Sequence, residues 1–247
     1  MSEFFSTLQA KDWITLTVSA CAFIVSVLSY YQKAGESRLA LRKQLTDLFE
    51  KLTAINTEFA MYRAKKDEYP AGYPGLLGDQ RRFLVRQAAF IATKIRHLVS
   101  PFEYLLLAGG HDDINDWSQA ERYFELAIST SSDPIDRGIA IRGYGRYLYN
   151  HGRLDEARKK FSEAVKSFEG TSDRFRVFRA DTFERWSDHE REWIETFEAD
   201  RLLQQALMEY EQLDNPARKA HEVDRLRAKV STGKRSHEAV KEPEVSE

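Results

Sequence analysis

Cysteine, proline and glycine are scarce in this chain of 247 residues. Its one cysteine, Cys21, excludes a disulfide framework and any cysteine-rich metal site. The 12 glycines and 6 prolines lie mainly between long stretches of helix-forming residues. No stretch alternates apolar with polar residues for long enough to predict a β-strand. We therefore expect an all-α protein whose stability comes from side-chain packing.

Motifs for catalysis and cofactor binding are missing as well. The sequence has no G-x-S-x-G turn, no P-loop, no G-x-G-x-x-G and no H-E-x-x-H pair. Its 6 histidines lie singly and are interpreted as surface residues. The run His111-Asp112-Asp113 offers oxygens to a hard cation, but acidic residues before a helix more often cap it. We predict no enzyme activity, no cofactor and no metal site.

Neither sign of charge is in excess, with 37 Lys and Arg against 39 Asp and Glu. This balance implies no general attraction to nucleic acid. Arg174, Arg176 and Arg179 alternate with apolar residues, so a helix would spread them around a buried stripe. We interpret them as a solvated face rather than an RNA or phosphate site, and expect no nucleic-acid partner.

One long apolar run stands out near the start of the chain, where residues 13–31 contain no charged side chain. As a helix this run would be roughly 28 Å long, close to the ~30 Å hydrocarbon thickness of a bilayer. Trp13 at one end and Tyr30 and Tyr31 at the other suit the two headgroup levels. The sequence therefore predicts a transmembrane helix over residues 13–31.

Most basic residues near this run follow it, at Lys33, Arg38, Arg42 and Lys43, whereas Glu3, Lys11 and Asp12 precede it. Because Lys and Arg are retained on the cytoplasmic side, residues 1–12 are predicted to be extracytoplasmic and the rest cytoplasmic, at a bacterial inner membrane. An alternative is a lipoprotein box ending in Cys21, which would make the protein secreted. The apolar residues that continue after Cys21 disfavour that alternative.

Small and hydroxyl side chains recur at spacings of four and three along one face of the predicted membrane helix. Such a face lets helix backbones approach closely in lipid, which predicts a homo-oligomer or a docked membrane partner. The alternative is that the hydroxyls bond back to their own helix. These predicted helix-packing residues are Thr15, Ser19, Ala22, Ser26 and Ser29.

Residues 32–100 carry two apolar seams with alternating spacings of four and three, from Leu41 to Tyr62 and from Leu84 to Leu98. The residues between them, 69–75, hold prolines and glycines and are expected to end the first helix, while the second is expected from about residue 79 to 99. Gly35 is a predicted break before the first seam. An antiparallel hairpin is the favoured reading. A parallel coiled coil between two chains, with a homo-oligomer through residues 15–62, stays open.

Residues 101–230 are predicted to form successive helices joined by short turns. Asp133 can cap a helix, Pro134 suits its first turn, and Gly152 ends it before the next begins. Small and large residues recur across this pair at Gly145, Leu148, Gly152, Ala157, Phe161 and Ala164. This pattern resembles the helix-turn-helix unit of tetratricopeptide (TPR) repeats.

Two neighbouring segments extend the resemblance. Ala120, Phe124 and Ala127 match the second helix of such a unit, although Gly109 and Gly110 are expected to interrupt its first helix. Residues 172–213 are expected to form an irregular further pair. A capping helix should run from Pro216 to about Val230, followed by a disordered tail over residues 231–247. A generic helical bundle is the alternative.

The resemblance implies a groove that binds protein partners. Arg142 and Arg146 fall one turn apart on the side that lines the groove, with Tyr149 and Asn150 on the next turn. In TPR proteins that grip the carboxylate of a peptide C-terminus, basic residues occupy similar places, so an acidic or C-terminal peptide ligand is implied here. A salt-bridged helix face is the alternative.

Together these features predict a single-pass membrane adaptor that holds protein partners at the cytoplasmic face of a bacterial inner membrane. A second hypothesis is a membrane-active effector, whose spanning helices oligomerise while the helical domain senses a signal. A secreted helper that assists folding near the export machinery would need the opposite topology.

Overall fold

The computed structural model describes the backbone of residues 10–65, 69–70, 72–193 and 196–240. The side chains of residues 10–22, 31, 34, 193, 196 and 231–240 are outside the description. Every regular element in the described part is a helix, which confirms the predicted all-α class. The chain divides into two compact units, Met1–Leu98 and Val99–Glu247.

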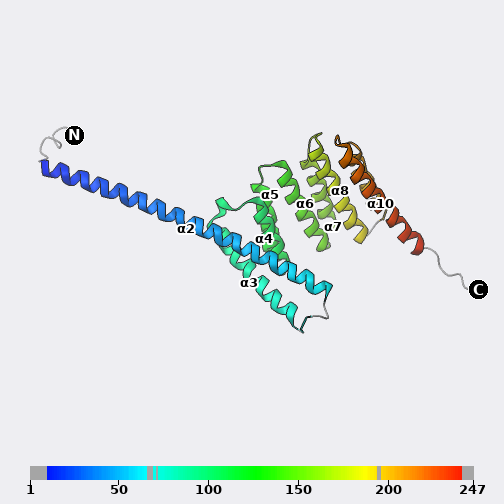
Figure 1. Cartoon of the computed structure of the whole chain (residues 1–247), viewed down its shortest axis with the longest axis horizontal. Coiled ribbons are helices and arrows are strands. Elements are labelled where there is room, and N and C mark those ends of the chain that lie inside the picture. Colours follow the sequence, from blue (N-terminus) through cyan, green and yellow to red (C-terminus); the bar gives the residue numbers. More distant parts are fainter. Residues whose placement is uncertain (1–9, 66–68, 71, 194–195, 241–247) are drawn as a thin grey trace, which may run out of the picture. The chain divides into compact units, whose positions relative to one another are not determined.

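The first unit is a long helix packed against a shorter one. Helix α2 (Ala10–Ala64) reverses into α3 (Tyr73–Lys94), and the 3-10 turn η2 (Arg96–Leu98) follows (Figure 1). The second half of α2 packs along α3, so the hairpin forms within one chain. The buried residues follow the two seams: Leu45, Leu48, Leu52 and Ile55 on α2, and Leu84, Ala88, Ile91 and Ile95 on α3.

The ends of these helices differ from the sequence-based expectation. Helix α2 continues through Gly35, because a single glycine costs only about 1 kcal/mol and its neighbours are good helix formers. Helix α3 begins at Tyr73 rather than near residue 79, after Gly72 with its positive φ of 89°. Pro74 lies in the first turn, where its missing N–H would have no helical partner anyway.

The predicted membrane segment lies inside α2. Thr15, Ser19 and Ala22 are outside the described side chains, whereas Ser26 and Ser29 are exposed. The apolar residues beside these serines are also exposed, with Phe23 at 70%. Within the part of the chain whose side chains are described, we find no helix long and apolar enough to cross a membrane.

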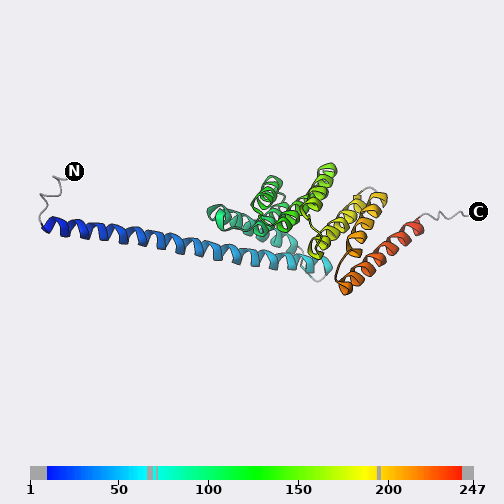
Figure 2. The same cartoon turned by 90° about the horizontal axis from the view of Figure 1, so that it is seen from above.

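The second unit is a row of helical pairs. In chain order its helices are α4 (Pro101–Asp113), α5 (Trp117–Thr130), α6 (Pro134–Asn150), α7 (Leu154–Ser167), α8 (Asp173–Trp193), α9 (Thr196–Glu211) and α10 (Pro216–Val240). The pairs α4/α5, α6/α7 and α8/α9 have the most extensive contacts, and α4, α6 and α8 also touch in turn (Figures 1 and 2). The unit is therefore an all-helical, repeat-like stack, with α10 against α9.

Local sequence signals set most of these helix ends. Ser100 and Glu103 form a capping box at the start of α4, and the Asp133 carboxylate accepts a hydrogen bond from the Ile135 N–H at 2.6 Å. Two expectations differ from the structure. Helix α4 runs straight through Gly109 and Gly110, and the backbone of α10 stays helical to Val240, into the predicted tail.

Two glycines of α6 let it approach α7 closely. A Cβ atom at Gly145, one of the small residues of the predicted repeat pattern, would lie 2.8 Å from the Phe161 ring. A Cβ atom at Gly138 would lie 2.4 Å from the Phe168 ring. Both phenylalanines are fully buried, so their rings have little room to move.

The substitution Gly138→Ala should lower the free energy of unfolding of the second unit. The forced overlap with Phe168 should cost 1–3 kcal/mol, and the better helix propensity of alanine should offset about 1 kcal/mol of that. The matched control is Gly109→Ala, where a Cβ atom would meet nothing within 4 Å. That control should raise stability by about 0.5–1 kcal/mol. Urea unfolding followed by circular dichroism measures both, and equal effects would contradict the packing argument.

Candidate functional site

The buried carboxylate of Glu190 makes hydrogen bonds that link helices α6, α7 and α8. Glu190 of α8 is fully buried and accepts hydrogen bonds from Tyr149 Oη of α6 at 2.5 Å and from Trp186 Nε1 at 3.0 Å. Arg158 of α7 donates to it twice, from Nε and Nη2, each at 2.8 Å. Burial alone would raise the pKa of Glu190, but the bonds from Arg158, Tyr149 and Trp186 lower it below its ordinary value.

This network decides where Tyr149 points. Its ring lies in the core, and burial together with the Glu190 carboxylate raises the pKa of its hydroxyl. Tyr149 therefore does not line a surface, which corrects its predicted role as a ligand-binding residue. Asn150, the next residue, is exposed at the end of α6.

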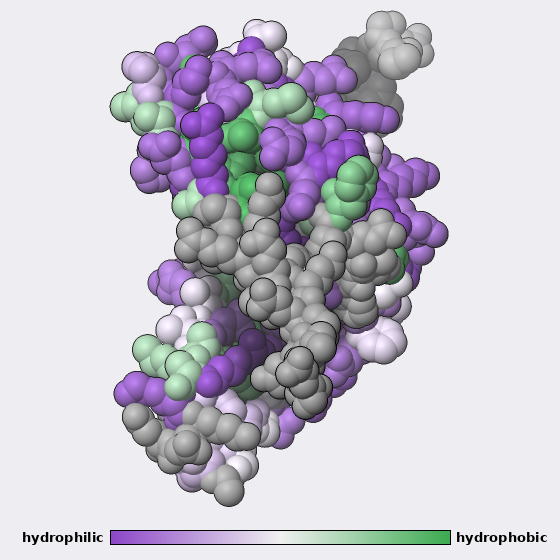
Figure 3. Space-filling model, turned by 90° about the vertical axis from the view of Figure 1, so that its right-hand side faces the viewer, coloured by the Kyte–Doolittle hydropathy of each residue, from purple (hydrophilic) through white to green (hydrophobic). Residues whose placement is uncertain are grey.

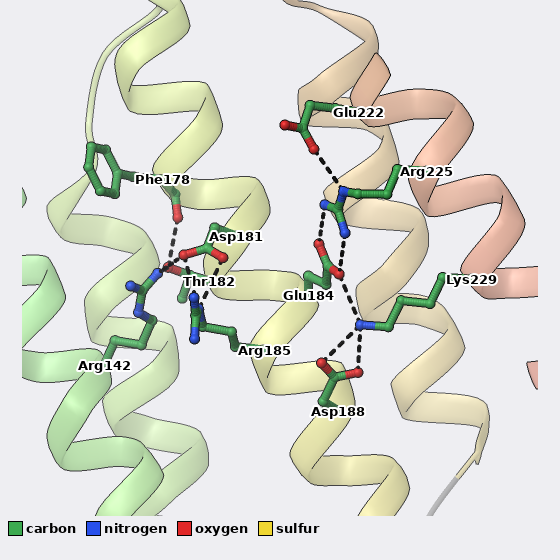
Figure 4. Close-up of polar contacts among 10 residues, drawn as sticks. All are labelled: Arg142, Phe178, Asp181, Thr182, Glu184, Arg185, Asp188, Glu222, Arg225 and Lys229. Carbon is green, nitrogen blue, oxygen red and sulfur yellow. Dashed lines mark hydrogen bonds and ion pairs between the residues drawn. The ribbon is translucent and has the colours of Figure 1, made fainter. Parts of the chain in front are cut away.

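Arg142 and Arg146 lie on α6 beside two charged residues of α8. Nη1 of Arg142 donates to the Asp181 carboxylate at 2.5 Å and to Thr182 Oγ1 at 3.2 Å, and Nε of Arg185 donates to the same carboxylate at 3.0 Å (Figure 4). Arg146 is exposed and makes no hydrogen bond or ion pair with another described residue. We call Arg142, Arg146, Arg185 and Asp181 the arginine cluster.

The arginine cluster holds an excess of positive charge, since it contains three arginines and one carboxylate, which pairs with Arg142 and Arg185. Burial is the main cause that lowers the pKa of Arg142, Asp181 raises it, and the positive charges of Arg185 and Arg146 lower it further. Arg185 lies near Arg142 because both bind the Asp181 carboxylate, and Arg146 follows Arg142 by one helical turn. A surface of this kind attracts anions, and guanidinium groups suit bidentate contact with a carboxylate.

His189 lies next to the arginine cluster and adds no charge to it. Its ring stacks on Tyr149 with centroids 5.2 Å apart. Its pKa is lowered mainly by burial, and the charge of Arg146 lowers it too, although Glu192 opposes this. The ring is therefore mostly neutral near pH 7, and it packs against Tyr149 without adding positive charge to the arginine cluster.

Sequence reasoning missed Asp181 and Arg185. Their separation of four residues was the available signal, because side chains at that spacing meet on a helix surface. That spacing is common on solvated helices, so it did not point to a site. What singles out Asp181 is its contact with Arg142, 39 residues earlier in the chain.

A second group of charges joins α8 to α10. Glu184 accepts hydrogen bonds from Nη1 and Nη2 of Arg225, at 2.8 and 2.7 Å, and from Nζ of Lys229 at 2.9 Å (Figure 4). Lys229 also reaches Asp188 at 2.9 Å. Beside these contacts lies a hollow of about 510 Å³ with Tyr210 in its wall. These ion pairs therefore hold α10 against α8, in addition to the apolar residues that α8, α9 and α10 bury together.

The described surface is mostly hydrophilic on the side shown in Figure 3, with smaller hydrophobic areas between the hydrophilic residues. Among the residues covered by the structure, no group of three His, Cys, Asp or Glu side chains is placed to hold a metal ion.

Comparison with known proteins adds little to this description. No protein-family model and no curated protein matches the chain. Among solved structures it is similar to the crystal structure of BtubC (BKLC) from P. vanneervenii, with 17% identity over 84% of this chain and 96% of that one. The TM-score is 0.41, a likeness that says nothing of what the chain binds. The fold and site define an all-helical, repeat-like protein with a basic surface cluster.

Acid should weaken the docking of α10. Burial raises the pKa of Glu184, but the bonds from Arg225 and Lys229 outweigh it and lower the pKa from 4.5 to about 2. Because the folded pKa is depressed, this stability is present above the unfolded pKa and is lost as pH falls from about 5 to 2, by at most about 3 kcal/mol.

The measurement is the free energy of urea unfolding at successive pH values. The control Glu184→Gln should be less stable at neutral pH and should lose less stability over the same acid range. An identical acid response in the wild type and in Glu184→Gln would show that Glu184 is not the group responsible.

Proposed function

We propose that this chain is a membrane-anchored, TPR-like adaptor that binds acidic or C-terminal segments of partner proteins at the arginine cluster. The observation that carries the proposal is that Arg142 and Arg185 share the single carboxylate of Asp181, with the exposed Arg146 one turn from Arg142 on the same helix. The proposed role is binding without a catalytic step.

The geometry gives each arginine a separate task. Arg142 is mostly buried and bound to Asp181 and Thr182, so it would stay in place when a ligand arrives. Arg146 is exposed and Arg185 is about half exposed, so both can turn toward a carboxylate. Because Asp181 already orients two guanidinium groups, less conformational freedom would be lost on binding.

The TPR-like part of the proposal is supported by packing at the positions that carry the resemblance. Ala157, Phe161 and Ala164 of α7 are fully buried, and Gly145 of α6 lies against Phe161. Ala120 and Ala127 of α5 are fully buried as well, as expected for the second helix of a unit. Such stacks expose a long face for ligands, and α4, α6 and α8 form one row of neighbours.

The membrane part of the proposal is supported by the apolar run of residues 13–31. In its described portion Phe23, Ile24, Val25 and Leu28 are all more than half exposed on α2. Consecutive residues point in different directions on a helix, so this surface is apolar on several sides, and lipid would cover it favourably. With Lys33, Arg38 and Arg42 on the cytoplasmic side, tethering would raise the effective concentration of bound partners at a bacterial inner membrane.

The effector hypothesis makes a different prediction about assembly. A pore or disrupting oligomer needs many spanning helices, whereas an adaptor works as a monomer or a small oligomer. Counting the subunits of the detergent-purified chain separates them, and a large ring would overturn the adaptor.

The substitution Arg146→Ala should weaken binding of an acidic probe about tenfold or more without unfolding the protein. The probe is a fluorescein-labelled hexapeptide with three Asp residues and a free C-terminus, because a carboxylate is what the exposed guanidinium would bind. Fluorescence anisotropy measures its dissociation constant. The matched control is Arg137→Ala, another exposed arginine of α6, which should leave affinity unchanged. Equal losses in both variants would sink the proposal.

The substitution Val25→Arg should reduce membrane association. An arginine near the middle of a spanning helix costs about 2.5–3.5 kcal/mol on insertion scales. The full chain should sediment with membranes after carbonate extraction, and the variant should shift toward the supernatant. Leu39→Arg is the control, since Leu39 is equally exposed on α2 but lies beyond the apolar run. A wild-type chain that stays in the supernatant would contradict the anchor.

A further inference from the structure

Helix α3 has a second apolar face that the hairpin does not use. Its inner face, which includes Leu84 and Ile91, is buried against α2. On the outer face Leu76, Phe83 and Phe90 are exposed at 55%, 66% and 62%. These three are spaced by seven residues, so they form a line along the helix. We call Leu76, Phe83 and Phe90 the outer stripe.

A hollow lies directly beside the outer stripe. It has a volume of about 360 Å³, and its walls come from both helices of the hairpin: Lys51, Ala54 and Ile55 of α2, and Gln80, Phe83 and Leu84 of α3. Phe83 belongs to both the stripe and the hollow. The stripe therefore continues into a groove that can take an apolar side chain, which is more than scattered surface residues offer.

The surroundings of the outer stripe are basic. Helix α3 carries Arg81, Arg82, Arg86 and Lys94 against one acidic residue, Asp79. Arg82 and Arg86 are exposed next to Phe83, and Nη1 of Arg82 donates to Asp79 at 3.0 Å. Nζ of Lys94 lies over the Phe90 ring, 5.1 Å from its centroid.

The rim continues on α2, where Lys51 is exposed at the edge of the hollow. The outer stripe thus has basic residues beside it at its centre (Arg86), at its end (Lys94) and across the groove on α2 (Lys51). This rim favours an acidic occupant and opposes a basic one.

We propose that the outer stripe is a docking site for an acidic amphipathic helix of another protein. The stripe spans fourteen residues, or roughly 21 Å of helix, which a partner helix of about four turns would cover. Its apolar side chains would fill the groove and cover Phe83, and its carboxylates would meet Arg82, Arg86 and Lys51. A second copy of this chain is disfavoured as occupant, because it would bring two basic helices face to face.

This surface is separate from the arginine cluster, which lies in the other unit of the chain. The inference therefore does not rest on the proposed function, and either can fail alone.

The test uses two helical peptides with the same leucine pattern, one with Glu and one with Lys at the flanking positions. Anisotropy titrations with the purified full chain should show the Glu peptide binding at least tenfold more tightly than the Lys peptide. The substitution Phe83→Gln should weaken the binding of the Glu peptide at least tenfold. Met208→Gln is the matched control, an exposed apolar residue of α9, and should leave the affinity unchanged.

Charge reversal provides the second measurement. The double variant Arg82→Glu with Arg86→Glu should prefer the Lys peptide, because the rim then has the opposite sign. Circular dichroism should show the same helix content in every variant, since these side chains are exposed.

Three results would overturn the proposal. The first is equal affinity for the two peptides, or affinity unchanged by Phe83→Gln. The second is self-association of the wild type that Phe83→Gln abolishes, which would make a second copy the occupant. The third is binding to anionic lipid vesicles by a chain that lacks residues 13–31, if Phe83→Gln abolishes that binding.

Discussion

The second unit depends on one buried charge being fully neutralised. Glu190 lies where α6, α7 and α8 meet, and its carboxylate accepts hydrogen bonds from side chains of all three helices. Removing a carboxylate from water costs several kcal/mol unless its partners are well placed, so the network favours the register of the second helical pair against the third in which these bonds form. That register sets which residues of α6 face outward, and with them the arginine cluster.

Close packing by small residues supports the same arrangement. Gly138 and Gly145 bring α6 against the rings of Phe168 and Phe161, and fully buried alanines line α7. Because these contacts leave no space for an added methyl group, the helices of a pair cannot slide past one another. The first unit is built differently, from two facing rows of larger aliphatic residues along α2 and α3.

The proposals concern three parts of the chain with different chemistry. We propose lipid for the apolar run of residues 13–31, carboxylates for the arginine cluster and an acidic amphipathic helix for the outer stripe. Both proposed protein-binding surfaces are basic, although the chain as a whole has a formal net charge of −2. Charge is therefore distributed unevenly, and association with acidic partners would be steered to these surfaces rather than to the whole molecule.

The sequence by itself determined the helical class and the two seams of the hairpin, because these depend on periodicity and on side-chain chemistry. The binding role of Arg142 and Arg146 stays a prediction. The sequence misplaced helix ends at Gly35, Tyr73 and Gly109, since the small backbone cost of a glycine is easily outweighed by neighbouring residues and packing. Only the tertiary structure decided that Tyr149 is buried, that Asp181 and Arg185 join the cluster, and that Phe83 faces outward. Those facts depend on how each helix is rotated about its axis, which is set by contacts between residues about 40 positions apart.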